Sequence, residues 1–188
     1  NLDKAYIEIL NLLHTDGKQI RRRGQDMIEL SHVFLELSNP RSRVIQNPAR
    51  SIHLPFLIGE FIWILSGSNS LSSIEFYNKK IPQFSDDGSS LYGAYGKRLK
   101  SQWNPLIKKL SEDAFTRQAV LSILTEEDLK AITRDFPCNL SLLFWSDDGL
   151  HLNLTTIVRS QDMYLGFPYD VFNWTMFQEC IAKSCNLQ

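Results

Sequence analysis

One cysteine and one carboxylate stand out in this sequence as side chains that could do chemistry. Cys138 directly follows Pro137 at the mouth of an apolar run, with Arg134 close by and Asp135 partly offsetting its charge. A positive neighbourhood lowers the pKa of a thiol and makes it nucleophilic. Free cysteines are more often inert core residues, so the residue types alone leave both interpretations open.

Glu60 interrupts the segment 54–67, LPFLIGEFIWILSG, which is apolar almost all round. A carboxylate there is either a hydrogen-bonded structural acid or an acid whose pKa burial has raised for proton transfer.

Three separated arginines could bind a phosphate, because the planar guanidinium group forms two hydrogen bonds to it; they are Arg22, Arg117 and Arg159. Because the net charge is only −1, an anion site must be local, and no basic stripe indicates nucleic-acid binding.

The composition limits the class of protein. The 188 residues are 43% hydrophobic and 22% charged, as expected of one domain with a sizeable core. The three cysteines form no C-x-x-C pair, which disfavours a disulfide framework and a zinc site, so we expect no metal and a reducing, cytoplasmic compartment. No apolar run reaches the roughly 18 residues of a membrane span, and no signal peptide opens the chain. The chain begins with Asn1 rather than Met, so we expect the natural N-terminus upstream.

The spacing of apolar residues predicts the elements that position these side chains. Amphipathic helices are expected at 2–14 and 170–185, and a buried helix in 54–67, with a proline at its start and Gly67 just past its end. Strands are expected at 27–37 and 115–124, with a hairpin at 140–158. Loops are expected at 15–26 and 81–96, and the two Asn-Pro steps within 39–50 disfavour helix there. This order predicts a single α+β domain over residues 1–188.

Several stretches, taken in order, resemble the thymidylate synthase family, which includes the deoxycytidylate and cytidylate hydroxymethylases. They are RRRG, GEFIWILSGSN, LYGAYGKRL, TRQAVLSI, DFPCN and VRSQDMYLGFPYD. The most specific is R-S-x-D-x-x-x-G-x-P-[FY]-[ND], here residues 159–170. The resemblance implies an α+β fold with a large mixed sheet, one face of which forms a homodimer interface.

The resemblance also implies a reaction between a pyrimidine nucleoside monophosphate and 5,10-methylenetetrahydrofolate. Addition of a thiolate at carbon 6 of the ring turns carbon 5 into a nucleophile, which is covalent catalysis. By position, Cys138 matches the nucleophile, Glu60 the acid that organises proton transfers, and Tyr95 the tyrosine associated with proton removal from carbon 5.

Further residues match binding positions of the family. Arg22, Arg159 and Ser160 match phosphate ligands, and Arg117 matches an arginine supplied across the dimer interface. The remaining matches lie near the base and the folate ring: Trp63, Asp162, Gly166 and Tyr169. Asn139, next to Cys138, is expected to contact the nucleotide.

Asp170 departs from the asparagine with which thymidylate synthases read the base. A carboxyl group accepts a hydrogen bond from the amine of cytosine and, when protonated, also satisfies ring nitrogen 3. The same change marks the cytidylate hydroxymethylases, so we expect a cytosine nucleotide. Alternatively, Asp170 caps the helix that follows it.

Three further departures surround the nucleotide: Gln118, Asn139 and Val158. They indicate a substrate other than standard dUMP. The first hypothesis is therefore a folate-dependent hydroxymethylase of dCMP or CMP. The alternatives are a divergent thymidylate synthase that methylates dUMP and a non-catalytic nucleotide-binding relative. The family pattern continues beyond CNLQ, so we expect the C-terminal part of its fold to be absent, and the choice of sugar is not readable.

Overall fold

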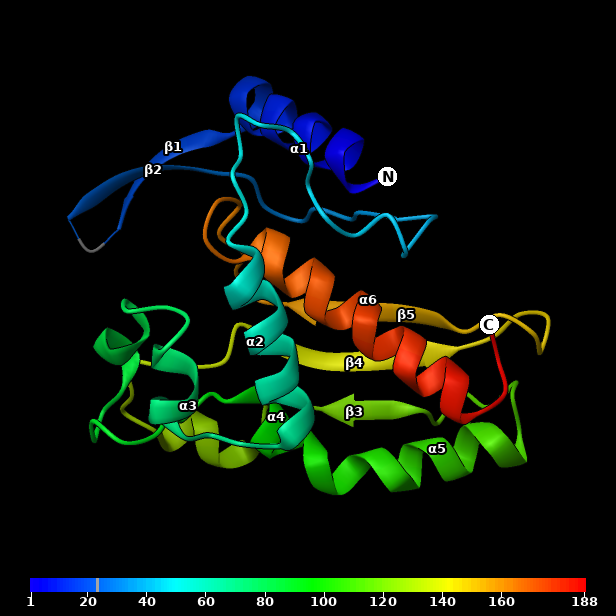
Figure 1. Ribbon diagram of the computed structural model, residues 1–188. Helices are drawn as coiled ribbons and strands as arrows, with labels where there is room; N and C mark the ends of the chain where they lie inside the picture. Colours follow the sequence, from blue (N-terminus) through cyan, green and yellow to red (C-terminus); the bar gives the residue numbers. More distant parts are fainter. Residues whose placement is uncertain (23) are drawn as a thin grey trace.

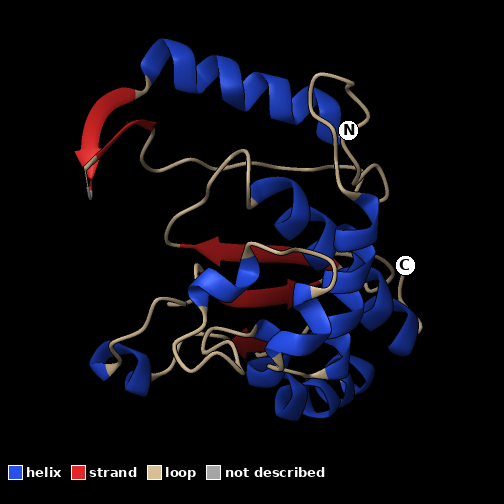
Figure 2. Cartoon of the chain, turned by 60° about the vertical axis from the view of Figure 1, so that its left-hand side comes forward, coloured by secondary structure: helices blue, strands red, loops and turns tan. Residues whose placement is uncertain are grey.

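The computed structural model describes residues 1–22 and 24–188 and arranges them in two layers (Figures 1 and 2). The upper layer holds α1 (Leu2–Asp16) and a hairpin of β1 (Lys18–Arg22) and β2 (Gln25–Glu29). The lower layer holds the other strands, β3 (Val120–Ser122), β4 (Asn139–Trp145) and β5 (Asn153–Val158), and five helices: α2 (Leu54–Ser66), α3 (Leu71–Glu75), α4 (Tyr95–Leu99), α5 (Trp103–Glu112) and α6 (Phe167–Ser184). Short 3-10 turns cover Ile81–Phe84, Lys100–Gln102 and Glu126–Lys130.

The central sheet has the order β3-β4-β5, and both pairings are antiparallel. In the described residues it is thus smaller than the large mixed sheet that the family resemblance implies. α2 and α6 lie in front of the strands in Figure 1. Leu142 and Phe144 point from β4 into the core on this side, where Phe144 packs against Phe177 of α6 with ring centroids 6.2 Å apart.

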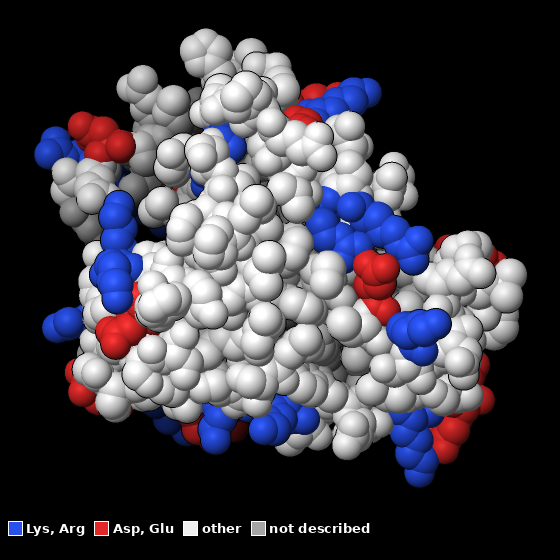
Figure 3. Space-filling model, viewed as in Figure 1, with Lys and Arg blue, Asp and Glu red and all other residues white. Residues whose placement is uncertain are grey.

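The buried helix predicted within 54–67 is confirmed as α2. Its Pro55 occupies the first turn, where no backbone N–H is needed, and Gly67 ends it in the left-handed conformation with φ 69°. The helix is not buried all round, because Leu54, Ile58 and Ile62 are exposed at successive turns. The face in Figure 3, with α2 and α6 toward the viewer, is mostly uncharged.

Helix α4 crosses α2 so closely that Gly96 has no room for a side chain. A Cβ atom there would lie 2.2 Å from the backbone oxygen of Ile64. This close approach places Tyr95, the first residue of α4, against the core formed by α2, α6 and the sheet.

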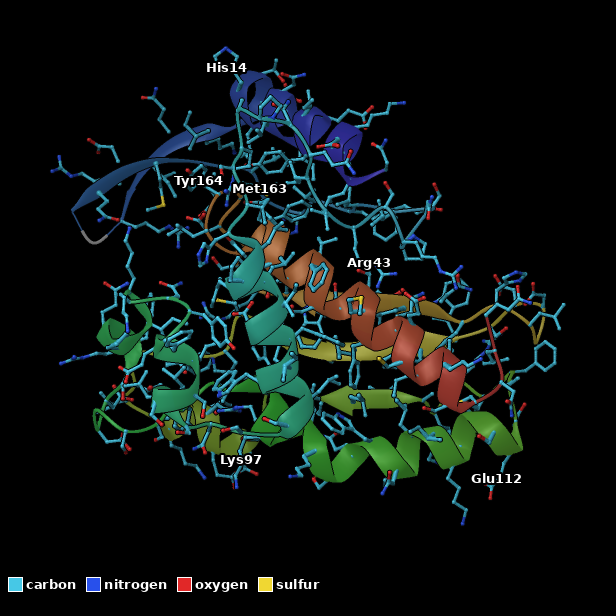
Figure 4. The ribbon with its side chains drawn as sticks, in the orientation of Figure 1. His14, Arg43, Lys97, Glu112, Met163 and Tyr164 are labelled. Atoms are coloured by element: carbon cyan, nitrogen blue, oxygen red, sulfur yellow. The ribbon has the colours of Figure 1, made fainter. Side chains whose placement is uncertain are left out.

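The upper layer is attached to α6. Leu2, Tyr6 and Ile9 of α1 form a cluster with Phe167, and the rings of Tyr6 and Phe167 stack at 6.1 Å. Figure 4 shows Arg43 close to α6, where it forms an ion pair with Glu179. The loop before α6 is held by Arg50, whose Nη2 donates to the backbone oxygen of Tyr164 at 2.6 Å.

The predictions for the first third of the chain are partly wrong. The loop expected at 15–26 contains β1 and the start of β2, since Gly24 with φ 80° permits a tight turn. Arg23, within the basic run, lies outside the described residues. The strand expected at 27–37 ends at Glu29, and the chain then runs without helix or strand to His53, through two Asn-Pro steps that disfavour helix.

Other boundaries also shift. The strand expected at 115–124 is confined to 120–122, while the hairpin at 140–158 is confirmed as β4 and β5. The helix expected at 170–185 begins at Phe167, because Pro168 fits the first turn. Helix α5 lies where no element was predicted. Among the described residues, no helix has both the length and the apolarity needed to cross a membrane.

Candidate active site

Cys138 precedes β4, and the pairing of β4 with β5 brings Arg159 beside it. The backbone N–H of Arg159 donates to the Cys138 oxygen at 2.9 Å, and its Nη2 lies 3.7 Å from Cys138 Sγ. The guanidinium is further held by the backbone oxygens of Phe136 and Pro137 at 3.0 and 2.9 Å. The family motif therefore places a fixed positive charge at the sulfur.

Burial raises the pKa of the Cys138 thiol above its ordinary value, although the Arg159 guanidinium lowers it. The charges of Asp170 and Asp135 also act to raise this pKa. The cation that lowers this pKa is Arg159, whereas Arg134, the arginine near in sequence, is not among the groups that shift it. The free protein thus keeps the sulfur mainly as a thiol, next to the charge that would stabilise the thiolate.

Asn139 points into the core and joins two aromatic side chains. Its Nδ2 donates to the Tyr95 hydroxyl at 2.9 Å, and its Oδ1 accepts from Trp174 Nε1 at 3.0 Å. Burial, and secondarily the Asp170 charge, raises the pKa of Tyr95 far above its ordinary value. Asn139 therefore fixes a neutral Tyr95 hydroxyl beside the Cys138 segment, rather than projecting toward solvent.

Glu60 accepts a hydrogen bond from Asn173 Nδ2 at 2.7 Å, which joins α2 to α6. Burial, and secondarily the nearby Asp170 charge, raises the pKa of Glu60 to about 8, although the Asn173 hydrogen bond lowers it. Its carboxyl group can therefore hold or release a proton near neutral pH, as general acid–base catalysis requires.

Asp170 is not a helix cap, so that interpretation is wrong. The helix begins at Phe167 with Gly166 as its N-cap, and Asp170 lies within the first turn with its backbone N–H bonded to the Gly166 oxygen. Its side chain accepts from Gln161 Nε2 at 3.0 Å. Burial raises the pKa of Asp170 to about 6. A Cβ on Gly166 would lie 2.7 Å from Gln161 Nε2, so this glycine leaves room for the contact.

These groups form one electrostatic cluster, because Asp170 raises the pKa of Cys138, Glu60 and Tyr95. The cluster combines a thiol beside a cation with protonatable carboxyl groups and a neutral phenol. Such a set can add sulfur to an electrophilic carbon and move protons on the same substrate.

Of the other predicted anion-binding residues, Arg22 and Arg117 lie on other elements. Arg22 is on the exposed β1, where its Nη2 pairs with Glu29 at 3.1 Å. Arg117, just before β3, lines a pocket of about 450 Å³ with Val120 and Trp145, which belong to the sheet face opposite α6. Ser160 is exposed and follows Arg159 directly.

The positions assigned to folate divide into two groups. Asp162 is exposed and holds the loop before α6 by accepting from the N–H groups of Tyr164 and Leu165, whose side chains are themselves exposed. Figure 4 shows Tyr164 in this loop, below the upper layer. An acceptor beside exposed apolar groups fits a flat ring that carries N–H donors, as a pterin does.

Trp63 and Tyr169, the two aromatic residues expected near the folate ring, are less suitable for contacting folate. Trp63 is buried in a core cluster, and its indole donates to the Ser70 oxygen at 3.1 Å. The Tyr169 hydroxyl accepts from the His53 N–H at 3.2 Å, and its ring packs on Phe56 at 5.0 Å. Asp162 and Gly166 thus remain the better candidates for folate contacts.

Gln161, Asn173 and Trp174 contact the cluster but were missed in the sequence. A sequence pattern could have identified Asn173 as a site residue. Like Glu60, it is a polar residue within an apolar helical stretch, and it follows Asp170 by three residues, on the same helix face. No comparable pattern marks Gln161 or Trp174.

A sequence model of the thymidylate synthase family matches residues 4–188, so the chain belongs to this family. It is 33% identical to a deoxyuridylate hydroxymethyltransferase of Bacillus phage SP01, over 95% of this chain and 51% of the relative. Another protein so named, from Pseudomonas phage M6, is 27% identical over 100% of this chain and 56% of its own length. The chain thus spans about half the length of the curated relatives it matches.

A solved structure of thymidylate synthase from T4 phage shares the fold. The TM-score is 0.58 at 23% identity, and the match covers 70% of this chain and 53% of the other. The predicted family and the α+β fold are therefore confirmed.

Proposed function

We propose that this protein is a folate-dependent enzyme that modifies carbon 5 of a pyrimidine nucleoside monophosphate. The observation that carries the proposal is the placement of Arg159 Nη2 3.7 Å from Cys138 Sγ, within a cluster that also holds Glu60 and Asp170. Cys138 adds to carbon 6 of the ring, which makes carbon 5 nucleophilic. Bound methylenetetrahydrofolate would supply the one-carbon unit.

The chain's own residues divide the remaining work. Arg159 stabilises the thiolate and, with Ser160, binds the phosphate. Glu60 exchanges protons at the base, since its pKa of about 8 lies near working pH. Tyr95, held neutral by burial and positioned by the hydrogen bond from Asn139, assists proton removal from carbon 5. Asp162 and Gly166 contact the folate.

We propose hydroxymethyl rather than methyl as the product, and a uracil nucleotide as the leading substrate. The names of the phage relatives, at 27% and 33% identity, favour both choices. Asp170 is compatible with uracil when it is protonated, because a neutral carboxyl group has one donor for oxygen 4 and one acceptor for the N3 proton. Its pKa of about 6 makes this form accessible.

A cytosine nucleotide is the second candidate, and Asp170 is the observation that favours it. An ionised carboxylate accepts from the amine of cytosine but repels oxygen 4 of uracil. An ionised Asp170 therefore favours cytosine, whereas a protonated Asp170 can pair with either base.

Tritium release from carbon-5-labelled dUMP, dCMP and CMP, with methylenetetrahydrofolate and mass spectrometry of the product, tests these assignments. We expect release from dUMP with a hydroxymethyl product. A methyl product would favour a thymidylate synthase, and release only from dCMP or CMP would establish the cytosine candidate. Absence of release from all three, by folded protein, would contradict the proposal and favour a nucleotide-binding relative.

We further propose that two copies associate through the outer face of the sheet. Val120, Trp145 and Ile157 are 47%, 39% and 43% exposed on this face, and Arg117 lines the pocket beside them. Association would bury this apolar surface and bring Arg117 to the phosphate site of the partner.

A further inference from the structure

Asn173 occupies a central position in the cluster, although no assigned role involves it. It lies on the same face of α6 as Asp170, one turn further along. Its side chain is almost fully buried, at 2% exposure, and its Nδ2 donates to Glu60 Oε2 at 2.7 Å. Because the carboxylate is an acceptor, this contact uses the amide Nδ2 and leaves Oδ1 available to another donor.

Among the described residues, two acceptors at this contact receive no hydrogen bond: Asn173 Oδ1 and the second oxygen of the Glu60 carboxyl group. Within the described part of the chain, Asn173 Oδ1 is buried and has no hydrogen-bond partner. In the same residues, the Glu60 carboxyl group receives its hydrogen bond only from Asn173, at Oε2. Buried acceptors are seldom left unpaired, and an ordered water usually satisfies them.

Water is the ligand whose chemistry fits this pair. It can donate one hydrogen to Asn173 Oδ1 and the other to the Glu60 carboxylate, and its lone pairs then remain free for a third neighbour. The site thus offers what hydration of a bound substrate needs: a held water molecule and a base that touches it.

We propose that Asn173 is a positioning residue that, together with Glu60, holds the water molecule that becomes the hydroxyl group of the product. The inference rests on the proposed hydroxymethylation. The water oxygen bonds to the exocyclic methylene carbon, the π electrons of the double bond between that carbon and carbon 5 move toward oxygen 4, and one water proton passes to Glu60. Expulsion of the Cys138 thiolate from carbon 6 then restores the C5=C6 double bond.

The surroundings of Glu60 suit this transfer. Asp170 and Asn173 are the polar groups that perturb Glu60, and burial with the Asp170 charge gives its carboxyl group a pKa of about 8. A base of this strength takes a proton from water that is attacking an electrophile more readily than an ordinary carboxylate does.

Two variants and a control test the role of Asn173 in turnover. In Asn173→Ala, which removes both contacts, we expect the ratio of hydroxymethyl product to tritium released to fall by about tenfold or more. Asn173→Asp keeps an oxygen at the water position and should retain most of the ratio. Thr175→Ala removes a hydroxyl from the same helix that, among the described residues, donates only to backbone oxygens, and should match the wild type. An unchanged ratio in Asn173→Ala would overturn the proposal. If that variant does not fold, a tenfold fall of the same ratio in Asn173→Asp would overturn the proposal instead.

Two measurements without turnover separate this inference from the proposed function. A crystal structure of the wild-type protein should contain a water within hydrogen-bond distance of both Asn173 Oδ1 and Glu60, and its absence would overturn the inference. By carbon-13 NMR, Asn173→Ala should raise the pKa of Glu60, because the lost hydrogen bond lowers it. If wild-type protein releases no tritium from any nucleotide, the proposed function fails, while these two results still decide whether Asn173 and Glu60 hold a water.

Discussion

At the scale of single residues, the reactivity of Cys138 depends on two opposing effects. Burial raises the pKa of its thiol, and Arg159, 3.7 Å from the sulfur, lowers it. A substrate phosphate that competes for Arg159 would weaken this stabilisation, so the thiolate depends on Arg159 keeping its contact with the sulfur.

Replacing Arg159 with Gln should therefore raise the pKa of Cys138 and slow its alkylation by iodoacetamide near neutral pH. The measurement is the pH profile of alkylation, followed residue by residue with mass spectrometry. Cys180 and Cys185 are internal controls, because Arg159 is not among the groups that shift their pKa values. An unchanged profile for Cys138 would contradict the assignment of Arg159 as the stabilising cation.

Glu60 should also affect stability in a pH-dependent way. Folding raises its pKa from 4.5 to about 8, so the folded state binds the proton more tightly, and stability falls as pH rises through this interval. A tenfold change in an acid constant corresponds to about 1.4 kcal/mol. We expect Glu60→Gln, which does not titrate, to gain stability relative to wild type between pH 5 and pH 9.

Urea denaturation at pH 5, 7 and 9 measures this difference. Glu112→Gln, at an exposed position of α5, is the matched control and should show little pH dependence. A constant difference between Glu60→Gln and wild type would mean that folding does not perturb Glu60.

At the scale of elements, the crossing of α2 and α4 determines where Tyr95 lies. Gly96 is next to Tyr95 and faces the Ile64 backbone, which cannot give way as a flexible side chain would. The crossing therefore sets the distance between the Tyr95 hydroxyl and Asn139, now 2.9 Å.

Gly96→Ala should push the two helices apart. Overpacking of this kind costs about 1–3 kcal/mol, so the midpoint of urea denaturation should fall, and tritium release should fall with it because Tyr95 is displaced. Ser101→Ala, on the exposed turn after α4, is the control. Wild-type stability in Gly96→Ala would show that α4 can shift without cost.

At the scale of the whole molecule, a shared site makes a distinctive prediction. If Arg117 serves the partner's site, Arg117→Ala and Cys138→Ser should each be inactive alone, yet should complement each other after they are denatured and refolded together. In an equal mixture about half of the dimers are mixed, and one of the two sites in each has both Cys138 and Arg117 intact. Roughly a quarter of wild-type activity per subunit should therefore return. No recovery in mixed dimers, verified by native mass spectrometry, would contradict the shared site.

The sequence by itself determined the identity of the reactive groups and the limits of the clearest helix. Cys138, Glu60 and Asp170 were recognisable because their types and motif positions are local properties, and Pro55 and Gly67 mark the ends of α2 through backbone sterics alone. The hairpin at 18–29 was missed because its pairing depends on one turn glycine rather than on a clear apolar alternation.

Only the tertiary structure decided how these groups act on one another. Asn173 meets Glu60 across 113 residues, and Arg159, not the sequence neighbour Arg134, reaches the Cys138 sulfur. The tertiary structure also placed Asn139 in the core and excluded Asp170 as a helix cap. Burial and distance set hydrogen bonds and pKa values, and both arise from packing between elements that are far apart in the sequence.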